Sequence, residues 1–257
     1  MQIRQMAGAL GAEITGIDLS QGMSPDLAAE LRARFLEHQV LVLRDQPLTP
    51  AQFMEFARAI GQPVEYPFVK GIDGYPQIIE VKKLAHETVN FGGIWHSDTT
   101  YLPQPPMASM LLAREIPPFG GDTLFASQYA AYEALSDTMK RLLDGLRGIS
   151  SSAKADVSKT REDRLKSDGK GEGPSSYTNS HPVVRTHPET GRKALFVNIA
   201  HTAGIEGLTD AESAPLLQFL FAHQVKPEFT CRVVWQPATL TLWDNRCVQH
   251  NPVNDYH

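Results

Sequence analysis

The chain has 257 residues, a formal net charge of −5 and a hydrophobic fraction of 42%, which fits one soluble domain with a sizeable core. Lys and Arg alternate with Asp and Glu rather than forming blocks, which argues against nucleic acid as a partner. No stretch approaches the roughly 18 apolar residues of a membrane span and the N-terminus lacks an apolar signal region, so we expect a cytoplasmic protein that does not enter membranes.

The first third of the chain predicts a mixture of helices and strands. Apolar residues recur at helical spacing in two segments, one preceded by Ser24 and the other by Thr49 and Pro50, which favour a helix start. Continuous or alternating apolar runs predict strands. The predicted elements are a strand, turn and strand within 6–19, a helix at 25–38, a strand at 40–44, a helix over about 50–60 ended by Gly61, and a strand at 78–81.

The remainder predicts a mainly β protein with two helices. Strands are expected at 108–114, 123–127, 183–186, 193–198, 229–235 and 239–243, and helices at about 128–146 and 210–224. Many short strands with a few surface helices favour a jelly-roll barrel, that is, a double-stranded β-helix, built as a single domain over residues 1–257. The polar segment 150–180 is expected to be a lid or a disordered loop, because long connections are usually functional or disordered.

The segment from Trp95 to Tyr101 contains the pair His96 and Asp98. Residues two apart on an extended backbone point to the same side, so these side chains can present a nitrogen and an oxygen to one point. A His-x-Asp tripeptide alone is weak evidence, because such residues also occur on exposed turns. His250, just beyond a predicted strand, offers a third ligand, and two His with one carboxylate leave open positions that suit ferrous iron.

Four segments closely resemble the taurine/chlorophenoxyacetate dioxygenase family, and the resemblance extends over nearly the whole chain in the order of the family. They are WHSDTTY (95–101), PPFGGDTLFAS (117–127), SHPVVRTHPETGRKALFVN (180–198) and WDNRCVQH (243–250). The resemblance implies a distorted double-stranded β-helix, iron held by His96, Asp98 and His250, and Thr123 as part of the 2-oxoglutarate site. It also implies that O2 and 2-oxoglutarate are consumed as cosubstrates.

The end of the sequence departs from the family pattern. Family members hold the far carboxylate of 2-oxoglutarate with an Arg about ten to fifteen residues beyond the distal His, because a guanidinium matches a carboxylate with two hydrogen bonds. The sequence ends at His257, and Arg246 is not at the matching position. Either a C-terminal strand segment after 257 is missing, or the cosubstrate binds weakly or not at all; we favour a missing segment.

The substrate pocket also departs from the taurine-specific pattern, which makes taurine a doubtful substrate. Approximate register places Tyr66, Val69, Gly92 and His201 around the substrate, and of these Tyr66 and His201 are the candidate substrate-binding residues. A solvent-facing or structurally satisfied role for His201 is about equally favoured. Trp95, Trp243, Cys231 and Cys247 are interpreted as packing residues, and His181, His187 and His223 as surface or capping residues.

The predicted activity is an iron(II)- and 2-oxoglutarate-dependent dioxygenase that hydroxylates a small anionic organic substrate and releases succinate and CO2. Hydroxylation beside a heteroatom would cleave the product. Two alternatives stay open: a zinc hydrolase, since two His and a carboxylate also suit zinc, and a non-catalytic metal-binding barrel. The sequence does not name the substrate and leaves the formation of a homo-oligomer open.

Overall fold

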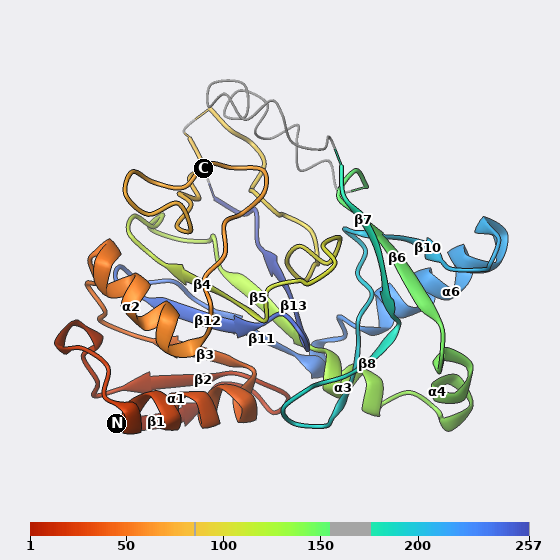
Figure 1. The fold of residues 1–257 in the computed structure, drawn as a ribbon, viewed down its shortest axis with the longest axis horizontal. Coiled ribbons are helices and arrows are strands. Elements are labelled where there is room, and N and C mark those ends of the chain that lie inside the picture. The colour runs from red at the N-terminus through yellow and green to blue at the C-terminus, as the bar shows by residue number, and fades with distance from the viewer. Residues whose placement is uncertain (85, 155–175, 257) are drawn as a thin grey trace.

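The computed structural model describes residues 1–84, 86–154 and 176–256, which form several β-sheets with helices on their outer faces (Figure 1). The largest sheet has five strands in the order β1-β2-β3-β12-β4. These strands are β1 (Gln2–Gln5), β2 (Ala12–Thr15), β3 (Val40–Leu43), β12 (Leu240–Asp244) and β4 (Ala108–Leu112). β2 and β3 are parallel, and the other neighbouring pairs are antiparallel.

Strand β3 is apolar on both faces because both faces of the sheet are covered. Leu41 and Leu43 pack with the apolar residues of α1 (Pro25–His38) and α2 (Pro50–Ile60). Val40 and Val42, which point the other way, pack against a second sheet. That sheet has the antiparallel order β11-β5-β13, with β11 (Thr230–Val233), β5 (Thr123–Ser127) and β13 (Val248–Pro252).

A third group of elements forms the other half of the molecule (Figure 1). It contains the sheet β10-β6-β7 and the pair β8-β9. The elements are β6 (Arg147–Ser151), β7 (Thr178–Pro182), β8 (Val184–Thr186), β9 (Lys193–Leu195), β10 (Thr202–Ile205), α3 (Gln128–Glu133), α4 (Asp137–Leu143) and α6 (Asp210–His223). Two short 3-10 helices are η1 (Leu19–Gln21) and η2 (Pro227–Phe229). A separate apolar core joins α6 to these strands.

Local sequence signals explain the main helices. Ser24 accepts a hydrogen bond from the backbone N–H of Leu27 at the start of α1, and Thr49 with Gln52 forms a reciprocal capping box at the start of α2. The helices predicted at 25–38 and 50–60 are therefore confirmed, as are the mainly β character and the strand at 123–127. The helix at 210–224 is confirmed as α6, and the strands expected at 40–44, 108–114, 183–186, 193–198, 229–235 and 239–243 are confirmed in shortened or slightly shifted form.

Three predicted elements differ from the structure. Residues 78–81 form no strand, because Ile78 bonds locally to Ile72 and Tyr75 in a turn and Val81 is exposed. The predicted helix at 128–146 is two helices, because the hydroxyl of Ser136 accepts a hydrogen bond from the backbone N–H of Met139 and starts α4 anew. The first predicted strand also lies earlier than expected, at 2–5, outside the segment 6–19.

The polar connection predicted at 150–180 begins and ends as paired strands. Ser150 in β6 is the partner of Asn179 in β7, so the ends of this segment are part of a sheet. Residues 155–175 lie outside the described residues, and so does the expectation of a lid or disordered loop there. Within the described ranges, no helix is both long and apolar enough to span a bilayer.

Candidate metal centre

A backbone bridge holds His96 and His250 side by side. The N–H of His96 donates to the carbonyl of His250 at 3.0 Å, and the N–H of His250 donates to the carbonyl of His96 at 2.7 Å. Residues paired in this way project their side chains to the same side of a ladder. The two imidazoles lie 4.1 Å apart between ring centroids, so the bridge brings together residues that are distant in sequence.

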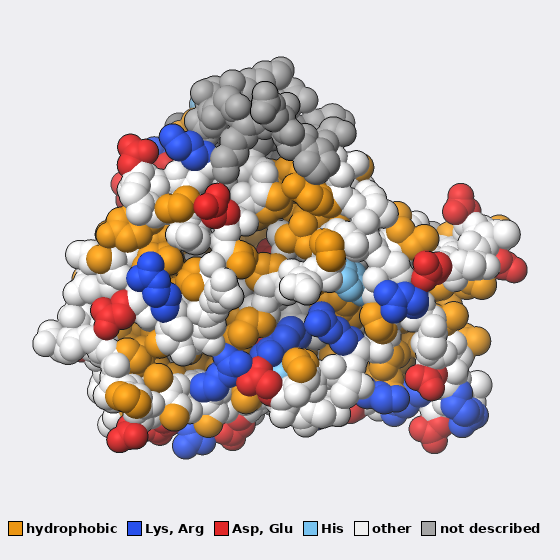
Figure 2. Space-filling model, in the orientation of Figure 1, with side chains coloured by type: hydrophobic (Ala, Val, Ile, Leu, Met, Phe, Trp, Pro, Cys, Tyr) orange, Lys and Arg blue, Asp and Glu red, His pale blue; other side chains and the backbone are white. Residues whose placement is uncertain are grey.

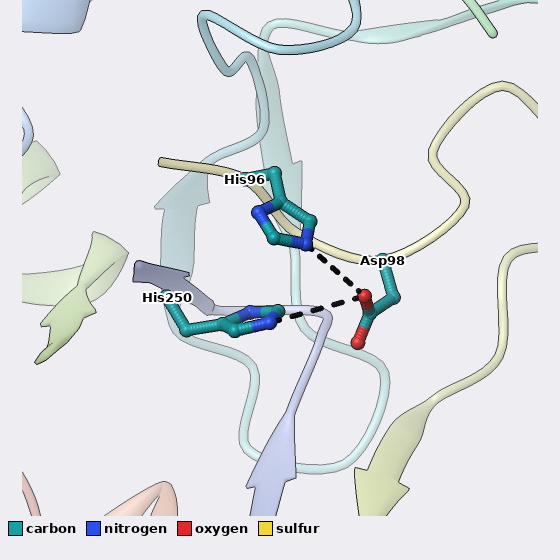
Figure 3. Close-up of side chains that lie close together, drawn as sticks. All are labelled: His96, Asp98 and His250. Carbon is teal, nitrogen blue, oxygen red and sulfur yellow. Dashed lines mark ion pairs between the residues drawn. The ribbon is translucent and has the colours of Figure 1, made fainter. Parts of the chain in front are cut away.

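Asp98 completes a compact group of three possible ligands (Figure 3). Its Oδ1 lies 3.5 Å from Nε2 of His96 and 4.0 Å from Nε2 of His250. The side chains of His96 and His250 are 11% and 9% exposed, whereas that of Asp98 is 27% exposed, so the carboxylate marks the open side of the centre. The structure thus brings together the three residues predicted from the sequence.

The surroundings of each histidine of the centre favour a ring nitrogen with a free lone pair. Nδ1 of His96 lies 2.7 Å from the carbonyl oxygen of Ile94 and donates to it, which leaves Nε2 free to accept. Burial lowers the pKa of His250 to about 3, so this imidazole is neutral at physiological pH. Neutral imidazole is the form that binds metals.

The carboxyl of Asp98 is ionised. Burial alone would raise its pKa, but the neighbouring His250 and His96 and the hydroxyl of Ser109 together lower it well below its usual range. Thr99, the next residue, has a φ of 48°, which is unusual for a β-branched side chain. Its carbonyl accepts the N–H of Leu102 in a turn, so the chain leaves the centre immediately after Asp98.

Aromatic and glycine residues shape the walls around His96 and His250. Trp243 lies 4.8 Å and Phe125 6.0 Å from the ring of His250, which agrees with the interpretation of Trp243 as packing; Trp95 is half-buried. Gly92 has a φ of +69°, and a Cβ there would lie 2.9 Å from Cε1 of His96. The close approach of this backbone to the imidazole therefore requires glycine.

The two substrate candidates meet at one buried tyrosine. The ring of His201 lies 5.0 Å from Tyr101 and 6.0 Å from His96, and Tyr66 hydrogen-bonds to Tyr101. His201 is only 4% exposed, so it does not face solvent, and its Nδ1 has no hydrogen-bond partner among the described residues. The ring of Phe68 contacts the rings of both Tyr66 and Tyr101, which makes this wall of the site aromatic.

Thr123, the predicted cosubstrate residue, begins β5 on the strand that runs beside His250. It is the partner of Pro252, while Phe125 is the partner of His250. Its hydroxyl is buried and accepts a hydrogen bond from Nε1 of Trp235 at 3.0 Å. Trp235 was not identified from the sequence, and an indole N–H at the end of a predicted strand gives no signal that could have found it.

A second group of possible ligands contains His187, Asp244 and Cys247. Arg246 occupies both oxygens of Asp244, through Nε at 2.8 Å and Nη2 at 2.6 Å, and Nε2 of His187 donates to the same carboxylate. A guanidinium in the place of a cation argues against a metal there. The group is a buried ion-pair network, and it explains why Arg246 is not available to a cosubstrate.

The network continues to the surface and ties three elements together. Glu189 accepts hydrogen bonds from Arg246 at 2.5 Å and from Arg32 of α1 at 2.6 Å. On the face drawn in Figure 2, Lys and Arg side chains lie next to Asp and Glu side chains. The turn between β12 and β13 is therefore bonded to the turn between β8 and β9, which is itself bonded to α1.

The interpretation of His187 and His223 as surface residues is wrong, whereas Nδ1 of His187 does cap a turn by accepting the backbone N–H groups of residues 189 and 190. His187 and His223 are 1% and 6% exposed. Nε2 of His223 donates to the carbonyl of Ala131, and half-buried His181 donates to the carbonyl of Leu102. Each histidine bonds to a group from a distant part of the chain, which a local pattern does not reveal. Cys231 and Cys247 are buried, as predicted.

Comparisons with known proteins identify the family of the chain. The profile of the family described as "Taurine catabolism dioxygenase TauD, TfdA family" matches residues 2–257. An alpha-ketoglutarate-dependent sulfate ester dioxygenase of Pseudomonas putida is 32% identical, over 100% of this chain and 85% of the relative. An alpha-ketoglutarate-dependent 2,4-dichlorophenoxyacetate dioxygenase of Cupriavidus pinatubonensis is 34% identical, over 93% and 87%.

A solved structure is similar over the same extent. The crystal structure of a taurine dioxygenase from Burkholderia xenovorans superposes with a TM-score of 0.81 at 32% identity. The match covers 99% of this chain and 86% of the other.

Proposed function

Since this chain belongs to the TauD, TfdA family of dioxygenases, we propose that His96, Asp98 and His250 hold the iron(II) with which it oxidises its substrate. It is an iron(II)- and 2-oxoglutarate-dependent dioxygenase. When bound, iron(II) would catalyse the reaction of O2 with 2-oxoglutarate, which yields succinate and CO2 and oxidises a substrate C–H bond. The observation that carries the assignment is the His96–His250 bridge with Asp98 between the two imidazoles.

The three side chains fit iron(II) by their chemistry. Two imidazoles and one carboxylate are the donor set of open non-haem iron sites, and they leave positions for other ligands. The ring tautomer of His96 is fixed by Ile94, so its Nε2 lone pair points toward Asp98. Trp243 and Phe125 cover His250 and exclude water from that side.

The remaining predicted residues have roles around this centre. We assign to Thr123 a part in holding a carboxylate of 2-oxoglutarate, because its buried hydroxyl lies on the strand beside His250. The fold that carries these residues is proposed to be a double-stranded β-helix, with the paired sheets of β3-β12-β4 and β11-β5-β13 as its walls.

The substrate is proposed to be a small organic anion. Relatives are named for sulfate esters and for 2,4-dichlorophenoxyacetate, both of which are anions with an apolar part. The aromatic wall of Tyr66, Phe68 and Tyr101 supports an apolar substrate body, and His201 supports a hydrogen bond to a polar group of the substrate. Hydroxylation at the carbon beside the ester or ether oxygen would cleave such substrates.

Anaerobic titration tests the assignment. Adding iron(II) and then 2-oxoglutarate should produce a weak visible charge-transfer band, and His96→Ala should abolish it. A panel of sulfate esters, sulfonates and aryloxy acids, scored by succinate release under O2, then identifies the substrate class. A band of wild-type intensity in His96→Ala would refute the ligand assignment.

The same titration separates the rival activities. A zinc hydrolase needs a general base, and Asp98 is the one carboxylate in this group of ligands over the described part of the chain. Zinc-dependent ester hydrolysis without succinate release would favour that alternative. Metal binding with no charge-transfer band and no turnover would favour a non-catalytic metal-binding barrel.

A further inference from the structure

The two oxygens of Asp98 have different surroundings. Oδ1 faces the two imidazoles, at 3.5 Å from Nε2 of His96 and 4.0 Å from Nε2 of His250. Oδ2 instead accepts a hydrogen bond from the hydroxyl of Ser109 at 2.6 Å, a length typical of a strong bond to a charged acceptor. One oxygen of the carboxylate therefore faces the two imidazoles, and the other is bonded to Ser109 on strand β4.

The direction of the Ser109 hydrogen bond is fixed by Asn245. Nδ2 of Asn245 donates to Oγ of Ser109 at 2.9 Å, and an amide nitrogen can only donate. Oδ1 of Asn245 accepts the backbone N–H of Asp98 at 3.3 Å, which agrees with this orientation of the amide. Since the Ser109 oxygen already accepts from Asn245, its single proton is directed to Asp98.

The two residues lie in or directly beside the pairing of β4 with β12 in the five-stranded sheet. Ser109 is the partner of Trp243 in the pairing of β4 with β12, and Asn245 follows β12 directly. The backbone N–H of Asn245 donates to the carbonyl of Met107 at 3.0 Å, and Asn245 is 2% exposed. Both partners of Asp98 are thus held by the sheet rather than by Asp98 itself.

We propose that Ser109 and Asn245 are positioning residues that make Asp98 bind the metal through one oxygen. This inference rests on the proposed metal centre. A carboxylate whose second oxygen is engaged offers only Oδ1, so the positions needed by 2-oxoglutarate and O2 stay free. The hydrogen bonds also fix the carboxylate before the metal arrives, which raises the affinity of the site.

Titration of the metal-free protein with MnCl2, followed by the electron paramagnetic resonance signal of free Mn(II), measures this effect without turnover. Ser109→Ala should raise the Kd for Mn(II) by about 10- to 100-fold, the usual cost of losing an outer partner of a metal ligand. Ser109→Thr retains the hydroxyl and should stay within about threefold of wild type. A Kd for Ser109→Ala within about twofold of wild type would overturn the proposal.

A matched control and a second variant keep the test decisive. Thr241 lies on β12 with a buried hydroxyl that has no hydrogen-bond partner among the described residues, so Thr241→Val should leave the Kd unchanged. Asn245→Ala removes another member of the same chain of hydrogen bonds, so the proposal can be tested even if Ser109→Ala does not fold. The double variant should lose less affinity than the product of the two single losses, because Asn245 acts in part through Ser109. Fully multiplicative losses would contradict the shared role.

His250→Ala separates this inference from the proposed function. Loss of Mn(II) binding in His250→Ala, together with an unchanged Kd in Ser109→Ala, overturns only the positioning role. Wild-type Mn(II) binding in His250→Ala overturns the metal centre and the positioning role together. Urea unfolding of each variant shows whether a change in Kd accompanies a loss of folding.

Discussion

Replacing Arg246 by Met removes the guanidinium from the buried ion-pair network that contains Asp244, His187 and Glu189. Arg246 donates to both oxygens of Asp244, at 2.8 and 2.6 Å, and to Glu189 at 2.5 Å. The side chains of Arg246 and Asp244 are 7% and 1% exposed. Met fills a similar volume, so the change leaves the carboxylate of Asp244 buried without its cation.

We expect this variant to lose about 3–5 kcal/mol of the free energy of unfolding at neutral pH, the cost of breaking a buried ion pair on one side. His187 still bonds to Asp244 in the variant, through Nε2 at 3.1 Å from Oδ2, but one hydrogen bond replaces neither of the two contacts made by the guanidinium. A domain is stable by only about 5–15 kcal/mol, so the loss is a large share of the total.

The pH dependence of the loss follows from Asp244. In the wild type, burial raises the pKa of Asp244, but the hydrogen bonds and charge of Arg246 lower it below its ordinary value. Its contribution to stability is therefore present above the unfolded pKa of about 3.9 and is lost as the pH falls through the folded value. Without Arg246, burial raises the pKa of Asp244, and protonation of this carboxyl at lower pH removes the cost of a buried unpaired charge. The difference between the two proteins should be largest near neutral pH and shrink toward pH of about 4.

Urea unfolding of metal-free protein measures the difference, with an unchanged m-value showing that the same surface is exposed. The control is Arg4→Ala, which removes an ion pair with Glu13 of 3.0 Å whose Arg side chain is 71% exposed. Exposed pairs contribute about 0–1 kcal/mol. A loss below about 1 kcal/mol for Arg246→Met, or one that grows as the pH falls, would refute the reasoning.

Three further changes test the site. Gly92→Ala should weaken Mn(II) binding, measured by titration, because its Cβ would lie 2.9 Å from the His96 ring; unchanged affinity would contradict this. Thr123→Val should raise the 2-oxoglutarate concentration needed for the charge-transfer band without changing the Mn(II) Kd. An unchanged 2-oxoglutarate concentration would show that the Thr123 hydroxyl serves only to accept the hydrogen bond from Trp235. His223→Ala should lower stability by about 1–3 kcal/mol in urea and leave the band intact, since its bond to a carbonyl is structural.

Regular patterns in the sequence were sufficient for much of the fold. The helix from Pro25 to His38 combines a capping serine with apolar residues at helical spacing, and both signals are local. Strands β6 and β7 were missed because RGISS and TNSHP show no apolar alternation; they pair with each other across a long gap in sequence. Residues 78–81 look like a strand but bond within a local turn instead.

Some residues of the candidate site could also be predicted from the sequence, and others could not. His96 and Asp98 could be found because their spacing is local, and His250 because the surrounding segment resembles a known family. The role of Ser109 could not be found, because a serine within an apolar strand becomes informative only when the register places it against Asp98. His187 was misjudged because its carboxylate partner lies on a distant hairpin.

The position of β12 has a consequence for the synthesis of the protein. It lies between β3 and β4, so until residues 240–244 have been synthesised those two strands have no partner between them. Open strand edges invite pairing with other chains, and a nascent chain at this stage should be a good client for chaperones. His250 follows on the next strand, so metal loading should come after the closure of the sheet.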